Sequence, residues 1–268
     1  MRGSYYNEID PFAAEMLRNL IAAGHIAPGD VDERSIEDVR PDDLRGYAQC
    51  HFFAGVGVWS YALRRAGYTD ARPVWTGSCP CQPFSTAGKG AGFADERHLW
   101  PHFHWLIEQC RPPIVLGEQV ASKDGLAWLD LVSADLEGSG YTSGAVDTCA
   151  AGFGAPHIRQ RLYWVADDLL QQRPHGQPGL GIEHASDGRI EDSAAIAGLC
   201  SDSNAGPTNG FWRDADWLFC RDGKWRPVEP GTFPLAHGAP ARVGRLRGYG
   251  NAIVAPLAAE FIRAYMDR

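Results

Sequence analysis

No stretch of this sequence is apolar over the roughly 18 residues that a membrane-spanning helix needs. Its first residues also lack the charged and then apolar pattern of a secretory leader. We therefore expect a soluble, cytoplasmic protein with no membrane partner.

Paired cysteine and histidine motifs are also missing. The seven cysteines are an odd number without regular spacing, and Cys79-Pro-Cys81 lacks the second Cys or His pair of a zinc site. We therefore expect reduced thiols in a reducing compartment and no bound metal. The sequence shows no internal repeat either.

The formal net charge of -8 at pH 7 is unfavourable for a nucleic-acid partner. The charge is uneven, because residues 1–50 hold ten acids and five Lys or Arg, whereas residues 205–250 hold four acids and seven Lys or Arg. The local field matters more than the total at a DNA-facing surface. The charge therefore does not exclude DNA.

Strand-like and helix-like segments alternate along the chain, which is typical of an α/β fold. Apolar runs predict strands over residues 4–8, from 48, over 72–76, 114–116 and 162–166, and short strands from 141. Helical spacing predicts helices over residues 11–23, 59–66, 99–110, 128–138 and within 242–265. Residues 28–44 are acidic and turn-rich, and residues 167–210 are typical of a loop-rich insertion.

The stretch Gly77-Ser-Cys-Pro-Cys-Gln-Pro-Phe-Ser85 follows the predicted strand 72–76 and should leave its C-terminal end. Ligands gather at that edge of open α/β sheets. Prolines on both sides of Cys81 stiffen the loop, which suits a thiol that must be aimed at a target. A proline-rich turn with two buried cysteines is the alternative interpretation.

Glu118 should lie at the same sheet edge, because it follows the buried strand 114–116. A thiol, a carboxyl group and the arginine pair Arg159 and Arg161 suit attack on an electron-poor heteroaromatic ring. Taken singly, Glu118 fits a solvated strand-end acid and the arginines fit a surface charge pair. Their combination is what indicates chemistry.

A strand, the turn Gly55-x-Gly57 and a helix together form a cradle for a nucleotide or cofactor, because glycine lets the backbone approach a ligand closely. Taken alone, this turn is equally typical of an ordinary tight turn.

Five ordered motifs resemble those of the DNA (cytosine-5) methyltransferase family. They are Phe53-Ala-Gly-Val-Gly57, Pro80-Cys-Gln-Pro-Phe-Ser85, Gly117-Glu-Gln-Val120, His157-x-Arg159-x-Arg161 and Gly250-Asn-Ala-Ile253. The chain departs from the family pattern at His51 for Asp, Gln119 for Asn and His157 for Gln. The longer side chain of Gln119 could shift Glu118.

The resemblance implies a catalytic set in which Cys81 attacks the cytosine, Glu118 binds its N3, Arg161 binds its carbonyl, and Arg159 steadies it or holds a phosphate. It implies S-adenosylmethionine as cofactor, bound by Glu8, Asp32 or Asp30, Phe53, Ala54, Gly55, Gly57, Pro80, Asn251 and Ala252. The residues expected at DNA are Gln82, Ser85, Lys89, Arg97, Arg213, Arg221, Lys224 and Arg226. The glycine-rich segment 86–98 is expected to close over the flipped base.

In the family, the acids that bind the cofactor ribose and adenine follow the glycine loop. Here little more than one helix separates Gly57 from Pro80, whereas Asn7-Glu-Ile-Asp-Pro-Phe-Ala-Ala14 resembles the missing segment. We therefore predict a permuted motif order, with Glu8 on the ribose hydroxyls and Asp32 on the adenine amine. Asp30 is the other candidate for the amine.

The resemblance predicts a Rossmann-like S-adenosylmethionine-dependent sheet with helices on both faces and a small loop-rich target recognition lobe. The catalytic domain would span residues 1–166, completed by 242–268, with the lobe at 167–241. The implied activity is methylation of cytosine C5 in a short duplex DNA sequence by a monomeric enzyme of a phage or bacterium, in restriction protection. Action on RNA, transfer of another group and an inactive DNA-binding relative are the alternatives.

Overall fold

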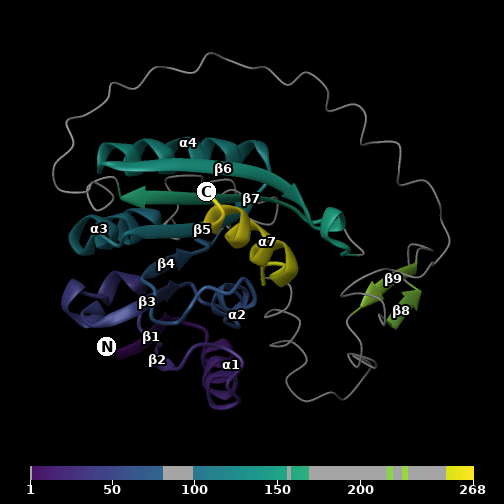
Figure 1. Cartoon of the computed structure of the whole chain (residues 1–268), viewed down its shortest axis with the longest axis horizontal. Helices are drawn as coiled ribbons and strands as arrows, with labels where there is room; N and C mark the ends of the chain where they lie inside the picture. Colours follow the sequence, from purple (N-terminus) through teal and green to yellow (C-terminus); the bar gives the residue numbers. More distant parts are fainter. Residues whose placement is uncertain (1, 81–98, 156–157, 169–215, 220–224, 229–251) are drawn as a thin grey trace.

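The computed structural model describes residues 2–80, 99–155, 158–168, 216–219, 225–228 and 252–268. Its centre is a seven-stranded sheet in the order β2-β1-β3-β4-β5-β7-β6 (Figure 1). The strands are β1 (Arg2–Asn7), β2 (Gly29–Asp32), β3 (Tyr47–Phe52), β4 (Val74–Gly77), β5 (Ile114–Val120), β6 (Tyr141–Cys149) and β7 (Gln160–Asp168).

The first five strands in this order of the sheet, β2 to β5, run parallel to one another, and β7 runs antiparallel to both β5 and β6. The carboxyl ends of β1, β3, β4 and β5 therefore meet at one edge, and the beginning of β7 reaches that edge from the other direction. This is a mixed α/β sheet, the fold class that the sequence predicts.

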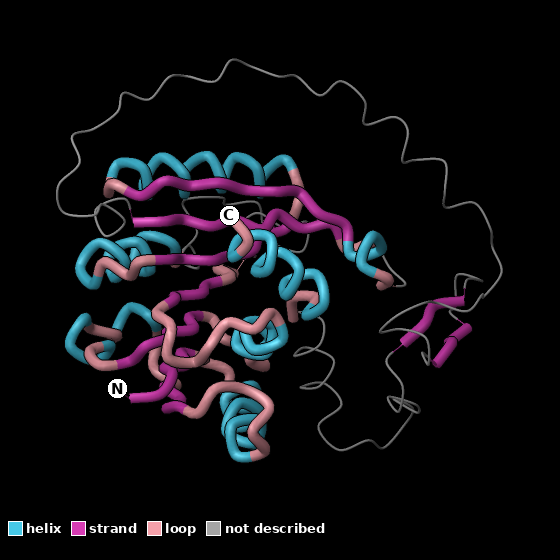
Figure 2. The backbone as a smooth tube through the Cα atoms, viewed as in Figure 1, coloured by secondary structure: helices cyan, strands magenta, loops and turns pink. Residues whose placement is uncertain are grey.

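Helices cover both faces of the sheet, as expected (Figure 2). The α-helices are α1 (Pro11–Ala22), α2 (Val58–Arg65), α3 (Trp100–Cys110), α4 (Lys123–Gly138) and α7 (Ala255–Met266). Short 3-10 helices are η1 (Ile36–Asp38), η2 (Pro41–Leu44) and η5 (Ala150–Phe153). Helix α1 begins where the Asp10 carboxylate accepts hydrogen bonds from the backbone N–H groups of Phe12 and Ala13, with proline in the first turn.

Two large apolar clusters fill the space between the sheet and its helices. On one face, α3, α4 and the 3-10 helices η1 and η2 pack on the sheet around Phe52, Phe103 and Val115. On the other face, α2 and α7 pack around Leu63, Leu116 and Ile262. A smaller cluster around Leu17 and Ile26 attaches α1 beside α2. Helix α7 thus shares an apolar cluster with residues of β4, β5 and β7.

Tryptophan is concentrated on the face covered by α3 and α4. Trp100, Trp128 and Trp164 are each about 1% exposed, and their rings contact one another with centroids 5.7 to 6.5 Å apart. The Trp100 indole N–H donates to the Asp135 carboxylate at 2.7 Å, which pins α3 to α4. These tilted and edge-to-face rings fill the space between the sheet and helices α3 and α4.

Several elements differ from the sequence-based expectation. Residues 29–32, expected as a turn, form β2 at the sheet edge, and residues 141–149 form one long strand rather than several short ones. Helix α4 begins at Lys123 rather than at 128, with the Ser122 hydroxyl as its cap. Strand β7 runs to Asp168, two residues past the expected domain boundary, and Arg111 clasps the Asp168 carboxylate there at 2.7 and 3.1 Å.

In the region expected to form the recognition lobe, the structure describes β8 (Asp216–Phe219) and β9 (Trp225–Val228), which pair antiparallel in a sheet of their own. The rest of 167–241 beyond Asp168 lies outside the described residues. Among the described helices, none combines the length and apolar character needed to cross a bilayer.

Candidate active site

The candidate site begins at a pair of glycines on adjacent strands. Gly77 and Gly117 face each other in the register of β4 and β5. A Cβ on Gly77 would lie 2.4 Å from the Phe103 ring, and a Cβ on Gly117 would lie 2.2 Å from the Trp164 indole. Both positions therefore point at the α3/α4 face. Because side chains alternate along a strand, Ser78 and Glu118 point at the α2/α7 face.

Glu118 is 8% exposed, and its carboxylate lies 2.9 Å from Nε of Arg161. Burial raises the pKa of Glu118, and this effect outweighs the lowering by the charges of Arg161 and Arg159 and by a hydrogen bond from Ser78. A carboxyl group in this setting is biased toward its protonated form, which can donate a hydrogen bond to a ring nitrogen. The structure thus brings together Glu118 and Arg161, as the sequence predicts.

Arg159 lies two residues before Arg161, with a left-handed backbone at φ 32°. Its guanidinium donates to the Ala252 carbonyl at 2.6 Å, so it connects β7 to the segment that precedes α7. Burial and the neighbouring charge of Arg161 lower the pKa of Arg159, although an arginine at this position stays protonated. The arginine pair therefore contacts the C-terminal motif at Ala252.

Sequence reasoning did not identify two residues beside Glu118. The Trp59 indole N–H donates to the Ser78 hydroxyl at 3.0 Å, and Ser78 in turn bonds the Glu118 carboxylate. The Gly77–Ser78 step at the end of a predicted strand was a usable signal for Ser78. Trp59 gave none, because its contact depends on how α2 crosses the sheet.

The expected nucleophile Cys81 lies outside the described residues. So do Gln82, Ser85, Lys89, Arg97, the closing segment 86–98, Arg213, Arg221, Lys224 and Asn251, while Arg226 falls within β9. The chain is described as far as Pro80, which is exposed, and burial raises the pKa of the preceding Cys79 thiol. Cys79 is therefore an inert core residue.

The glycine loop follows β3 at the same sheet edge. Phe53, Gly55 and Gly57 all adopt positive φ, of 52°, 55° and 76°. Glycine adopts this left-handed conformation without strain, whereas it is uncommon for a residue such as Phe53. The Phe53 ring packs edge-on against Phe103. Such a backbone leaves a concave turn at the amino end of α2, which can cradle a ligand.

Glu8 lies directly beside this loop, because β1 neighbours β3. Its carboxylate accepts from the Gly55 N–H at 2.7 Å and from the Asp10 N–H at 2.8 Å. The Ala54 N–H donates to the Asn7 carbonyl at 3.0 Å. The two segments that resemble cofactor motifs are thus joined, although about 45 residues separate them in the sequence.

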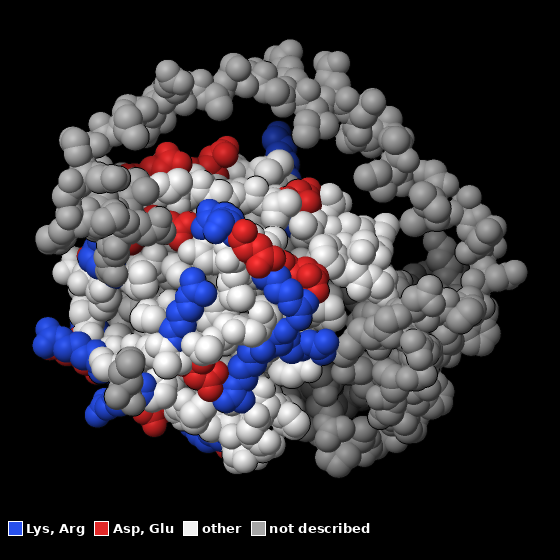
Figure 3. Space-filling view, viewed as in Figure 1, with Lys and Arg blue, Asp and Glu red and all other residues white. Residues whose placement is uncertain are grey.

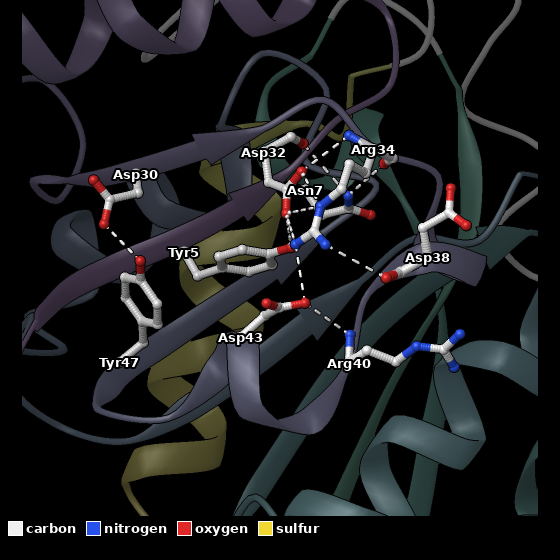
Figure 4. Close-up of polar contacts among 9 residues, drawn as sticks. All are labelled: Tyr5, Asn7, Asp30, Asp32, Arg34, Asp38, Arg40, Asp43 and Tyr47. Atoms are coloured by element: carbon white, nitrogen blue, oxygen red, sulfur yellow. Dashed lines mark hydrogen bonds and ion pairs between the residues drawn. The ribbon is translucent and has the colours of Figure 1, made fainter.

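Asp30 and Asp32, the two candidates for the adenine amine, have different surroundings (Figure 4). Asp32 is half-buried and accepts from the Tyr5 hydroxyl at 2.7 Å and from the Arg34 guanidinium at 2.7 to 3.1 Å. Burial acts to raise the pKa of Asp32, but hydrogen bonds from Arg34 and Tyr5 outweigh it and lower the pKa. Asp30 is exposed and accepts from the Tyr47 hydroxyl at 2.5 Å.

Two of the departures from the family pattern are explained by the structure. Burial lowers the pKa of His51 to about 3, so the ring is neutral; its Nδ1 lies 2.8 Å from the Thr76 hydroxyl and the ring stacks on Tyr6. Gln119 points to the face opposite Glu118 and bonds the Val120 N–H through its own side-chain oxygen. Its extra length does not reach Glu118. His157 lies outside the described residues.

Residues 70–179 match the sequence profile of the C-5 cytosine-specific DNA methylases. This span contains Cys81, Glu118, Arg159 and Arg161 in the expected order. The matched span comprises 110 of the 268 residues of the chain. Residues 1–69, with Glu8 and the glycine loop, lie outside the matched span.

Among curated proteins, the chain is similar to type II methyltransferases. The type II methyltransferase M.PspPI of Psychrobacter sp. is 28% identical over 187 residues, which make up 53% of this chain and 45% of that protein. M.HaeII of Haemophilus aegyptius, also a type II methyltransferase, is 36% identical over 90 residues, 32% of this chain and 28% of that protein. The chain thus spans less than half the length of either relative.

Among solved structures, a mutant of Spodoptera frugiperda DNMT2 aligns with a TM-score of 0.43 and 16% identity, over 65% of this chain and 45% of that one.

On the face of the molecule drawn in Figure 3, Lys and Arg side chains lie beside Asp and Glu side chains over the described part. The ion pairs of the described part include Arg64 with Asp70 and Arg268 with Asp167.

Proposed function

We propose that this protein is an S-adenosylmethionine-dependent DNA cytosine-5 methyltransferase. The observation that carries the proposal is the buried Glu118, paired with Arg161 at the sheet edge where the Cys81 segment leaves β4. A carboxyl group biased toward its protonated form and flanked by guanidinium groups suits a pyrimidine whose N3 must be protonated and whose carbonyl must be bound.

The chemistry follows from the weak nucleophilicity of cytosine C5. The Cys81 thiolate would add to C6 of a flipped cytosine while Glu118 gives its proton to N3, which makes C5 enamine-like. Arg161 would donate to the ring carbonyl, and Arg159 would hold Arg161 and the ring in place from the Ala252 side. After methyl transfer to C5, loss of the C5 proton and expulsion of the thiolate would restore the aromatic ring.

Residues at the sheet edge fit the cofactor. The concave backbone from Phe53 to Gly57 and the Glu8 carboxylate beside Gly55 match what an adenosine group needs, a close backbone approach and an acceptor for vicinal hydroxyls. When bound, S-adenosylmethionine supplies the electrophilic methyl group. The proposed binding residues are Glu8, Asp32 or Asp30, Phe53, Ala54, Gly55, Gly57, Pro80, Asn251 and Ala252.

We propose that the motif order is permuted, with the ribose and adenine unit encoded before the glycine loop. Two observations support it: β1 lies next to β3 in the sheet, and Glu8 bonds the glycine loop directly. Neither the pairing of β1 with β3 nor the hydrogen bond from Gly55 to Glu8 would form if the segment before β3 were a separate appendage. The test of this order is given in the Discussion.

Residues 167–241 are proposed as the target recognition lobe, with the core formed by 1–166 and 242–268. The segment holds the basic and tryptophan-rich stretch 211–226, whose residues could contact phosphates and bases. We further propose a monomer in the cytoplasm of a bacterium, encoded by the bacterium or a phage.

Methylation of plasmid DNA in an expressing host tests the function. Bisulfite sequencing should show 5-methylcytosine at one short sequence context in cells that express the wild type. Cys81→Ser should abolish the modification, a loss of at least about 1,000-fold, because a hydroxyl is a far poorer nucleophile than a thiolate. Binding of S-adenosylhomocysteine by Cys81→Ser, measured by calorimetry, should stay within about threefold of wild type, since the thiol attacks the base and not the cofactor.

Unmodified plasmid from cells with abundant folded wild type would contradict the proposal. Tritium release from C5-labelled tRNA, with none from DNA, would favour the RNA substrate instead. Absence of heat with S-adenosylhomocysteine would favour an inactive DNA-binding relative.

A further inference from the structure

Glu118 is bound from two sides. On β7, Arg161 pairs with the carboxylate, and Arg159 adds a second positive charge nearby. On β4, the Ser78 hydroxyl bonds the same carboxylate. The strand register places Ser78 there, because Gly77 pairs with Gly117 and the next residue of each strand points at the α2/α7 face.

Ser78 is itself held in one orientation. The Trp59 indole N–H, which can only donate, gives its hydrogen to the Ser78 oxygen at 3.0 Å. A serine hydroxyl has a single hydrogen, so this contact leaves that hydrogen for Glu118. Trp59 is 5% exposed, and its ring packs edge-on against Tyr163, which is the partner of Glu118 in the β5–β7 register.

We propose that Ser78, oriented by Trp59, is a positioning residue that sets the direction and the protonation of the Glu118 carboxyl group. The proposal rests on the proposed function, in which Glu118 protonates the base. Ser78 favours the ionised carboxylate and keeps it aimed at the sheet edge. Trp59 is the second residue of α2, directly after the glycine loop, so the same contact links the proposed cofactor cradle to the base-binding acid.

Among the residues that the structure describes, the charged and titratable neighbours of Glu118 are Arg161 and Tyr163 on β7 and Arg159 just before it. Removing the Ser78 hydroxyl leaves all three in place. The remaining effect on Glu118 is then the loss of one hydrogen bond to its charged form, which should raise the pKa of Glu118.

Carbon-13 NMR of protein labelled at the glutamate side-chain carboxyl carbon measures this directly. The resonance that disappears in Glu118→Gln belongs to Glu118, and its titration gives the midpoint. We expect Ser78→Ala to raise the midpoint by about one pH unit, the effect of one hydrogen bond to a charged group. Trp59→Phe should raise it by a smaller amount, because Ser78 stays but is free to turn.

Ser143→Ala is the matched control, since Ser143 donates to Glu137 at 3.2 Å on the exposed side of β6, away from the site. It removes a serine–glutamate hydrogen bond and should leave the Glu118 midpoint unchanged. An unchanged midpoint in Ser78→Ala, or an equal change in Ser143→Ala, would overturn the role of Ser78. The titration needs no catalysis, so it decides the role of Ser78 even if the wild type fails to methylate DNA.

The rate profile gives the functional readout. Methyl transfer that requires protonated Glu118 falls as the pH rises through its pKa. In Ser78→Ala, the alkaline limb of kcat should therefore move to higher pH by the same amount as the NMR midpoint. A limb that stays in place while the wild type is active would overturn the link between Ser78 and catalysis.

Discussion

The environment of Glu118 sets opposing demands on one carboxyl group. Burial raises its pKa above the ordinary glutamate value of 4.5, while Arg161, Arg159 and Ser78 pull it down and burial prevails. The folded protein therefore favours the protonated form relative to the unfolded chain. This contribution to stability is present in full below pH 4.5 and is lost as the pH rises through the raised pKa.

Glu118→Gln should remove this pH dependence, because the amide keeps the shape and carries no charge. We expect the free energy of unfolding of the variant, relative to wild type, to increase between pH of about 4 and about 8. Urea unfolding followed by tryptophan fluorescence at both pH values measures it. Glu137→Gln, at an exposed position of α4, is the control for loss of a carboxyl group. A difference that is the same at both pH values would contradict the expectation.

At the residue scale, the sequence predicts that Glu118 and Arg161 lie together, but it does not predict the contacts of Ser78 and Trp59 that support Glu118. Glu118 lies in β5, and the Cys81 segment follows β4 in the sequence. Because β4 and β5 are parallel neighbours, the strand ends alone predict that both lie at one edge. Arg161 is the second residue of β7, which runs antiparallel to β5, so the direction of β7 places Arg161 at the same edge. The contact of Ser78 with Trp59 depends on the crossing of α2 over β4, which no local pattern encodes.

The elements β4 and β5 carry the site because two positions on them have no side chain. The lack of a Cβ at Gly77 and Gly117 leaves room for the rings of Phe103 and Trp164, which occupy those positions on the α3/α4 face. A methyl group there would push these rings, or the strands, apart. The adjacent Ser78 and Glu118 would move with the strands.

Gly117→Ala should therefore destabilise the protein by about 1 to 3 kcal/mol, the usual cost of overpacking a core. Thermal and urea unfolding measure the loss. Gly144→Ala is the matched control, since Gly144 lies in β6 and a Cβ there meets nothing within 4 Å. Equal stability of the two variants would show that the Trp164 contact can relax without cost.

Strand β2 shows where local sequence fails at the scale of elements. Gly29-Asp-Val-Asp32 has one apolar residue, and glycine and aspartate are depleted in strands. It becomes a strand because β1 supplies a partner in parallel register from Ser4 to Asn7. The helices were easier to predict, since their apolar spacing and caps are local. Helix α4 was placed too late because its first turn is polar.

Across the whole molecule, the order of strands in space differs from their order in the sequence in an instructive way. The starts of β1, β3 and β4 lie at one edge, since Arg2 pairs with Tyr47 and Gln49 pairs with Val74. The turn at residues 69–72 lies at this edge as well, because the Thr69 carbonyl accepts from the Gln49 side chain. The first unit could therefore be encoded after α2 without altering the sheet.

A rearranged gene tests this. Moving residues 2–45 into the turn between Asp70 and Ala71, with short glycine–serine linkers, should give a folded protein within about 2 kcal/mol of the wild type, because closing short loops costs little. Far-ultraviolet circular dichroism and urea unfolding measure it, and calorimetry with S-adenosylhomocysteine measures whether the cradle survives. A chain that unfolds without a cooperative transition would show that the sheet forms only when β1 precedes β3 in the sequence.

The one-sided distribution of indoles has an optical consequence. Trp100, Trp128 and Trp164 lie close enough for excitation energy to transfer from one indole to another, so their fluorescence reports on the cluster as a whole. Trp59 is on the opposite face, next to the glycine loop. Fluorescence of the three-indole cluster therefore reports on the packing of helices α3 and α4 on the sheet, and fluorescence of Trp59 reports on ligand binding at the glycine loop. Comparing each signal with that of Trp59→Phe would separate them in a single cuvette.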